Sequence, residues 1–291
     1  MAKDSRKYVI EAVGWELDLS KGPLIMGVLN VTPDSFSDGG EYHNPAKAIA
    51  HGLEMLAEGA DIIDIGGEST RPGSKAVSVA EQLKRVVPVV EALSKQGDMP
   101  ISVDTSSAEV ARQALAAGAG IINDISAGRA DQQMFEVVAE SGCPVVLMHM
   151  QGTPEDMQAE PHYEDVVEEI TGFLAKAIER AITGGVYRDR IIVDPGIGFG
   201  KTVEHNLEIL RNLEEFHRLG RPLLVGTSRK SFIGRILSRD LPKERIWGTA
   251  ATVALAVAAG AHIVRVHEVY QMSQVASMAY AVTASGAHML G

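Results

Sequence analysis

The stretch PLIMGVLNVTPDSFSDGG, residues 23–40, joins a short apolar run to a polar, glycine-rich segment. The apolar run 23–29 predicts a buried strand, and the segment after it, NVTPDSFSDGG, predicts a loop at the carboxyl end of that strand. Similar short runs rich in Val, Ile and Leu follow at roughly even spacing: 61–65, 101–104, 121–125, 144–148, 191–193, 222–225 and 263–266. Eight parallel strands can close into a barrel whose polar loops share one rim, so functional residues should gather there.

Helical patterns alternate with these runs. They cover residues 46–58, 79–94, 108–117, 133–141, 163–182 and 203–216, with 231–237 and 244–259 both following the seventh run. Gly59, Gly118 and Gly142 are placed as helix stops. We therefore predict an α/β fold, a single (β/α)8 TIM barrel over 22–285 within one domain, 1–291, with a short N-terminal β-hairpin cap in 1–20. An open doubly wound sheet is disfavoured, because it needs fewer strands and a GxGxxG after the first, which is absent.

Composition excludes several classes of partner. The net charge of −11 and pI near 5.3 argue against nucleic acid or an anionic membrane, because both repel an acidic surface. Cys143 is the single cysteine, so no intrachain disulfide can form, and the first residues lack the apolar stretch of a signal peptide. The longest uncharged run, 249–263, is shorter than the roughly 20 residues that span a bilayer. We expect a cytoplasmic protein with no membrane partner.

Two aspartates end predicted strands. Asp104 closes ISVD and Asp194 closes IIVD, so each carboxylate sits where a buried strand stops. An unpaired charge there would cost several kcal/mol. The pair could form salt bridges with neighbouring Lys or Arg, but together with Asn123 they favour an edge that binds a ligand rich in N–H donors.

Cationic residues follow the last two strands. Lys230 and Ser231 stand just past the seventh strand at the start of a helix, while Arg265 and His267 alternate along the eighth and so share one face. An anion is expected between them. The loop GGESTRPGS, residues 66–74, adds Ser69, Thr70 and Arg71, and its glycine and proline flanks suit a mobile lid that brings a cation to the reaction.

The segment DPGIGFGKT, residues 194–202, ends like a phosphate-binding loop. That template requires a glycine five residues before Gly200, and Pro195 stands there, so we reject a nucleotide site. Its glycines would instead let a tight loop approach a flat ligand, with Phe199 available for contact.

Seven motifs together carry a family resemblance: NVTPDSFSDGG, DIIDIGGESTRPGS, SVDT, IINDISAG, DPGIGFGKT, GTSRKSFIG and RVHE. In content and order they resemble bacterial dihydropteroate synthases, from about Met26 to His267. The resemblance implies a transferase of tetrahydrofolate biosynthesis that joins 7,8-dihydropterin-6-ylmethyl diphosphate to 4-aminobenzoate and releases diphosphate. It also implies a homodimer, a sulfonamide target and a need for Mg²⁺.

The resemblance also assigns residues. The pterin would lie among Asp104, Asn123, Asp194 and Lys230, lined by Ile125, Met148, Phe199 and Gly226, with Arg265 stacked on the ring. The diphosphate would meet Asn30, Thr70, Arg71, Arg265 and His267, with Mg²⁺ on Asn30 and either Asp34 or Asp38 as a further candidate ligand. The 4-aminobenzoate carboxylate would meet Ser231, and Phe36, Thr70 and Pro72 would wall its ring. Asn30, Arg71, Asp104, Lys230, Arg265 and His267 are the candidate catalytic residues.

Two other functions share parts of this pattern. The pterin domain of a corrinoid-dependent methyltransferase would keep the barrel and some carboxylates, but has no reason to keep NVTPDSFSDGG with SRKS. A noncatalytic pterin-binding barrel would keep Asp104, Asn123 and Asp194 and lose Asn30, Arg71 or Lys230, all of which are present.

Overall fold

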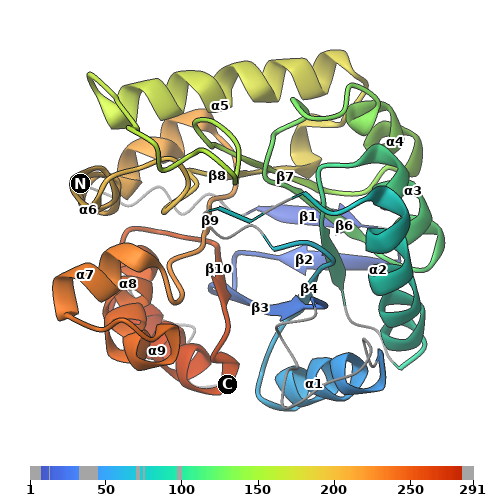
Figure 1. The fold of residues 1–291 in the computed structure, drawn as a ribbon, viewed down its shortest axis with the longest axis horizontal. Helices are drawn as coiled ribbons and strands as arrows, with labels where there is room; N and C mark the ends of the chain where they lie inside the picture. Colours follow the sequence, from blue (N-terminus) through green and yellow to red (C-terminus); the bar gives the residue numbers. More distant parts are fainter. Residues whose placement is uncertain are drawn as a thin grey trace.

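The computed structural model describes residues 8–12, 14–32, 45–69, 73–74, 76–96 and 100–283. Within them, eight parallel strands pair in the order β8-β7-β6-β5-β4-β3-β10-β9. A bridge from Val193 to Leu223 joins the two ends of that order and closes the sheet (Figure 1). The predicted TIM barrel is confirmed. Its strands are β3 (Leu24–Asn30), β4 (Ile62–Gly66), β5 (Ile101–Asp104), β6 (Ile121–Asp124), β7 (Val145–Met148), β8 (Ile191–Asp194), β9 (Leu224–Val225) and β10 (Ile263–Val266).

Helices surround the sheet, and several begin at a residue that caps them. Ser78, Ser107, Asp165 and Thr202 accept hydrogen bonds from backbone N–H groups of the first turns of α2, α3, α5 and α6. The helices are α1 (Pro45–Ala57), α2 (Val79–Ser94), α3 (Ala108–Ala116), α4 (Met134–Ser141), α5 (Val166–Thr183), α6 (Val203–Arg211), α7 (Ser231–Leu237), α8 (Ile246–Ala258) and α9 (Val269–Thr283), with short 3-10 turns η2 (Arg188–Arg190), η3 (Leu213–Leu219) and η4 (Pro242–Arg245).

The predicted helix over 203–216 is divided. The α-helix ends at Arg211. The next residue, Asn212, has a φ of −116° and a ψ of 25°, which lie outside the helical region, and the chain continues as η3. Asn212 also donates from its side chain to the carbonyl of Glu208, so it competes with the backbone for a helical acceptor. Helix α9, which follows the last strand, lies outside the predicted helices.

The predicted N-terminal hairpin is present as β1 (Val9–Ala12) and β2 (Trp15–Asp18), paired antiparallel. Ile10, Leu17 and Leu19 are buried against an apolar layer that seven barrel strands contribute: Met26, Ile62, Ile121, Val146, Ile192, Leu224 and Ile263. The hairpin therefore covers the amino-terminal end of the barrel, and the opposite end is left for ligands.

The inward layer of the strands alternates with a period of two residues. Two positions beyond the apolar layer, the same strands carry Val28, Asp64, Asn123, Met148, Asp194, Gly226 and Arg265, and most of these line one cavity. The register places Asn30 beside Gly66, Gly66 beside Asp104 and Asp104 beside Asn123. Residues far apart in sequence thus meet at one rim.

No helix in the described ranges has the length and apolar character needed to cross a membrane.

Candidate active site

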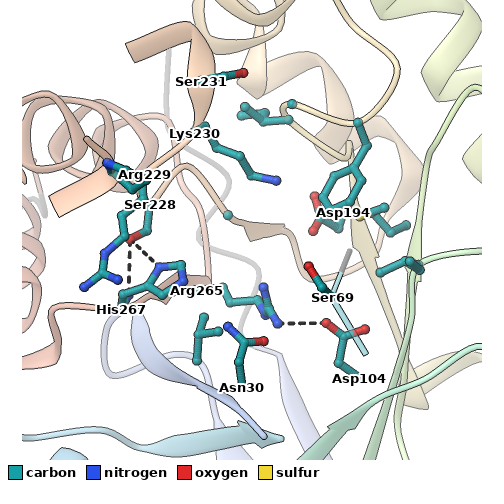
Figure 2. A pocket seen from close by; sticks show the side chains of 18 of the residues that line it. Asn30, Ser69, Asp104, Asp194, Ser228, Arg229, Lys230, Ser231, Arg265 and His267 are labelled. Atoms are coloured by element: carbon teal, nitrogen blue, oxygen red, sulfur yellow. Dashed lines mark hydrogen bonds and ion pairs between the residues drawn. The ribbon is translucent and has the colours of Figure 1, made fainter. Parts of the chain in front are cut away.

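A cavity of about 270 Å³ opens at the carboxyl ends of the strands (Figure 2). Every predicted site residue that the structure describes lines it: Asn30, Asp104, Asn123, Ile125, Met148, Asp194, Phe199, Gly226, Lys230, Ser231, Arg265 and His267. Phe36, Thr70, Arg71 and Pro72 lie outside the described residues, as do the candidate metal ligands Asp34 and Asp38. The strands therefore bring the two predicted groups, acidic and basic, into a single cavity.

Arg265 lies at the centre of a buried polar network. Its Nε donates to Asp64 Oδ2 at 2.6 Å and its Nη2 donates to Asp104 Oδ2 at 2.8 Å. Asn123 donates from its side-chain amide to the same Asp64 oxygen at 3.0 Å. Asp104 thus meets both expectations for it, because it forms a structural ion pair with Arg265 and also lines the cavity where a ligand would bind. The contacts engage the edge of the guanidinium and leave its plane to face a ligand.

Asp194 is placed differently. It is 6% exposed, accepts from the backbone N–H of Gly196 at 2.7 Å, and makes no ion pair among the residues that the structure describes. Burial raises the pKa of its carboxyl, opposed by that hydrogen bond and by the charge of Lys230. A buried carboxylate with so few donors is suited to accept hydrogen bonds from a ligand.

Lys230 points into the cavity toward the side where Asp194 lies (Figure 2). Burial and the charge of Arg265 lower its pKa to about 7, although Asp194 and Asp104 oppose the shift. Its Nζ lies 3.7 Å from the centre of the Phe199 ring. Phe199 belongs to an apolar cluster with Ile125, Met148, Met150 and Met157, which forms a nonpolar wall beside the charged groups.

The basic side of the cavity is held by two turns. Ser228 Oγ lies 2.9 Å from His267 Nδ1, and the backbone N–H of His267 donates to the same oxygen at 3.2 Å. Next to them, Arg229 Nε donates to Glu268 at 2.6 Å, which ties the turn after β9 to the turn after β10. Ser231 begins α7 directly after Lys230, so backbone N–H groups of that first turn also face the rim.

Sequence reasoning missed several polar residues in and around the site, among them Ser228, which lines the cavity, and Asp64, His149 and Lys201, which lie behind it. Asp64 could have been found from the alternation in DIIDIGG, because it lies on the same face of its strand as Ile62 and Gly66. Ser228 could have been found from its position in GTSRKSFIG, two residues before the predicted site residue Lys230. Nothing in the sequence pairs His149 with Lys201, which are brought together only by the packing of two loops.

The comparisons with known proteins agree with this geometry. The family model described as pterin binding enzyme matches residues 26–267. The chain is 51% identical to dihydropteroate synthase of Synechocystis sp. over 265 residues, covering 91% of this chain and 92% of the relative. The structure of Xanthomonas albilineans dihydropteroate synthase with 4-aminobenzoic acid superposes with a TM-score of 0.90 at 46% identity, covering 96% of this chain and 100% of the other. The same enzyme in complex with 7,8-dihydropteroate gives 0.86 at 43% identity, with the same coverage.

The chain therefore belongs to the pterin binding enzyme family. Within that family it is a dihydropteroate synthase, a transferase of folate biosynthesis. The resemblance of the seven motifs is confirmed, and neither a methyltransferase domain nor a noncatalytic barrel is the function of these relatives.

Proposed function

We propose that the cavity binds the pterin of 7,8-dihydropterin-6-ylmethyl diphosphate by its polar edge. The observation that carries this proposal is the buried Asp194 carboxylate, which makes no ion pair in the described part of the chain, facing Lys230 beside an apolar wall. The aminopyrimidinone edge offers adjacent N–H donors, which one carboxylate accepts as a pair, and a ring oxygen that accepts from an ammonium. Asn123 and Asp104 lie further along the same edge, and Ile125, Met148 and Phe199 contact the ring.

Arg265 stacks on the pterin in this proposal. Its ion pairs with Asp64 and Asp104 hold the guanidinium by its edge, so the plane is fixed before the ligand arrives. The same cation lies on the side of the cavity that His267 lines, where the diphosphate would sit with Thr70 and Arg71. Diphosphate leaves well only when its developing negative charge is neutralised, to which the Arg265 guanidinium contributes from the position that its ion pairs fix.

Asn30 is the described residue that fits Mg²⁺. Its amide oxygen lines the cavity at the end of β3, and the described residues hold no group of three or more His, Cys, Asp or Glu side chains that could bind a metal by themselves. Mg²⁺ keeps several waters and is usually held by one or two protein oxygens plus substrate phosphates, so one amide oxygen suffices. When bound, the ion neutralises charge on the diphosphate.

The reaction is a dissociative substitution. Loss of diphosphate leaves a pterin-methyl cation, which the nearby carboxylates of Asp104 and Asp194 stabilise. The aromatic amine of 4-aminobenzoate is neutral at pH 7 and attacks without an obligatory general base. Exchange of labelled diphosphate into the substrate in the absence of 4-aminobenzoate supports this order of events, and its absence under conditions of full pterin binding contradicts it.

The 4-aminobenzoate carboxylate meets Ser231 and the amino-terminal turn of α7, where backbone N–H groups face an anion. The family resemblance assigns contacts with its ring to Phe36, Thr70 and Pro72, which lie outside the described residues. A sulfonamide offers an aromatic amine opposite an acidic group in the same way, so sulfonamides compete with 4-aminobenzoate for this subsite.

A cytoplasmic location of the protein also stays a prediction.

Two copies of the chain associate through α8 and α9. These helices pack side by side (Figure 1) and expose large apolar side chains to solvent. On α8, Trp247 is 80% and Leu255 60% exposed, and on α9, Tyr270, Met278 and Val282 are also exposed. Trp247, Ala251 and Leu255 recur every four residues and form one stripe. Large exposed apolar side chains on two neighbouring helices are typical of a subunit interface, and twofold pairing would cover them.

The experiment that tests this function measures diphosphate release by the purified protein with Mg²⁺ and dihydropterin diphosphate, with and without 4-aminobenzoate. Release that depends on 4-aminobenzoate and is lost in Asp194→Asn supports the proposed pterin edge. Full release by Asp194→Asn would remove Asp194 from the site.

A further inference from the structure

Lys201 is an ammonium buried inside its own loop. Its side chain is 3% exposed, and its Nζ donates to the carbonyls of Gly196 at 2.8 Å and Phe199 at 2.9 Å. The Nζ also lies 3.0 Å from His149 Nδ1. The His149 carbonyl is a fourth, more distant acceptor at 3.5 Å. The three closer acceptors match the three N–H groups of an ammonium, and in the described part of the chain Lys201 forms no ion pair. Burial lowers the pKa of Lys201 well below its usual range, and the charge of Asp194 opposes this shift. The three close acceptors around Nζ suit the protonated form, which has three N–H donors.

His149 is suited to be the third acceptor. Burial, together with the charges of Lys201 and Arg129, lowers the pKa of His149 to about 2, so the ring is neutral and its Nδ1 accepts from the ammonium. The ring packs edge-on against Phe173, with the two ring centres 4.9 Å apart, and the backbone N–H of His149 donates to the backbone carbonyl of Asp194 at 3.0 Å. The acceptor is therefore fixed by contacts independent of Lys201.

The three bonds hold the loop that forms the pterin wall. Gly196, Gly198 and Gly200 all have positive φ, and the N–H of Phe199 donates to the carbonyl of Gly196 at 3.0 Å, so the loop curls around the Lys201 ammonium. A fold made of glycines has little conformational preference of its own. Its shape depends on the groups that engage its carbonyls.

The loop also contacts Lys230. The Phe199 ring lies 3.7 Å from Lys230 Nζ, and a Cβ on Gly198 would meet Lys230 Cδ at 2.7 Å. The loop thus contacts both the stem and the head of the lysine that points across the cavity (Figure 2). A shift of the loop by even a fraction of an ångström would move both Phe199 and Lys230.

We propose that Lys201 is a positioning residue for the pterin subsite: its ammonium holds the Gly196 and Phe199 carbonyls so that the Phe199 ring and Lys230 Nζ stand where the pterin is bound. This inference rests on the proposed binding of pterin between Asp194 and Lys230. It does not involve the proposed 4-aminobenzoate subsite at Ser231.

The test compares Lys201→Met and Lys201→Gln with the matched control Lys176→Met, an exposed lysine on α5. Pterin affinity is measured by fluorescence titration, and the Michaelis constant for 4-aminobenzoate is measured at saturating dihydropterin diphosphate. We expect both Lys201 variants to weaken pterin binding at least tenfold and to leave that Michaelis constant within twofold, while the control changes neither. Equal losses for both substrates, or unchanged pterin affinity in a folded Lys201 variant, would overturn the proposal.

A double-mutant cycle with Phe199→Leu separates positioning from simple loss of stability. If Lys201 acts through Phe199, adding Lys201→Gln to Phe199→Leu weakens pterin binding by much less than it does in the wild type. Additive effects would contradict this, and thermal unfolding of each variant shows the folded fraction.

Tyr163→Phe replaces the Lys201 variants if they do not fold, because the Tyr163 hydroxyl donates to the Gly200 carbonyl of the same loop at 2.8 Å. A selective loss of pterin affinity in Tyr163→Phe supports the proposal that the loop positions the pterin subsite. Unchanged pterin affinity in this variant contradicts it. Failure of the wild type to bind pterin would instead refute the proposed function.

Discussion

Arg265 donates to two carboxylates from a position where its side chain is 19% exposed. Asp64, one of these carboxylates, is fully buried and also receives the Asn123 amide. Removing one partner of a buried ion pair is costly because the remaining charge keeps its desolvation penalty. The charged side chains of the site therefore orient one another through ion pairs and hydrogen bonds before a ligand binds.

Asp64→Asn should therefore lower the free energy of unfolding by about 3 kcal/mol and reduce turnover more than tenfold, since Arg265 loses a charged partner. Urea unfolding and diphosphate release measure the two effects. The control is Glu179→Gln, which breaks the exposed pair of Glu179 with Arg188 and should cost less than about 1 kcal/mol. Equal changes in the two variants would show that the Asp64 pair is not a buried structural element.

The pKa of Lys230, lowered to about 7 by burial and by Arg265, predicts a pH dependence of pterin binding. Below pH 7 the side chain is protonated and, in the proposed complex, donates to the pterin oxygen. Above pH 7 the free protein loses that proton, so affinity should fall by roughly tenfold per pH unit until the pKa of the bound state is reached. Titrations from pH 6 to 9 test this against Lys230→Arg, whose guanidinium stays charged. Parallel profiles would assign the dependence to the ligand instead.

At the scale of elements, the loop between β8 and α6 depends on glycines at defined positions. Gly196 has φ of 68°, and a Cβ there would clash with the backbone carbonyl oxygen of His149. Gly196→Ala should displace the loop, destabilise the protein by about 2 kcal/mol or more and abolish measurable pterin binding.

Gly172→Ala is the matched control for this change. Gly172 lies inside α5 with nothing near its Cβ position, so alanine should stabilise the protein by about 0.5–1 kcal/mol without affecting binding. Thermal unfolding and pterin titration measure both variants. Normal pterin binding by Gly196→Ala would mean that the close contact with His149 relaxes without consequence.

The sequence predicts the strands, most helices and many of the described cavity residues, because the alternation of residues along each strand and the parallel order of the strands place those residues at one rim. Arg265 and His267 illustrate this, since their spacing alone places both on the inward face. The partners of these residues are not predictable in this way. Asp64 is separated from Arg265 by 201 residues and Lys201 from His149 by 52, so those contacts exist only once the barrel is closed. The end of α6 just before Asn212 was missed for a local reason, a side chain that competes for a backbone carbonyl.

At the scale of the whole molecule, the hairpin covers one end of the barrel, the cavity occupies the other, and the exposed apolar side chains of α8 and α9 lie on the flank. Trp247→Glu combined with Leu255→Glu should convert a dimer into a monomer, because two charges would be buried in the interface. Sedimentation at micromolar concentration measures this, with the exposed Leu53→Glu on α1 as the control. A wild type that sediments as a monomer would remove the proposed interface.

We propose that the cavity is divided, with the carboxylate edge around Asp194 binding pterin and the basic side around His267 binding diphosphate. The most direct test is calorimetric titration of a pterin lacking phosphate, and separately of diphosphate with Mg²⁺, into the wild type, Asp194→Asn and His267→Ala. We predict that Asp194→Asn weakens pterin binding at least 100-fold and diphosphate binding less than threefold, while His267→Ala weakens diphosphate binding at least tenfold and pterin binding less than threefold. Similar losses of both ligands in both variants would contradict the division.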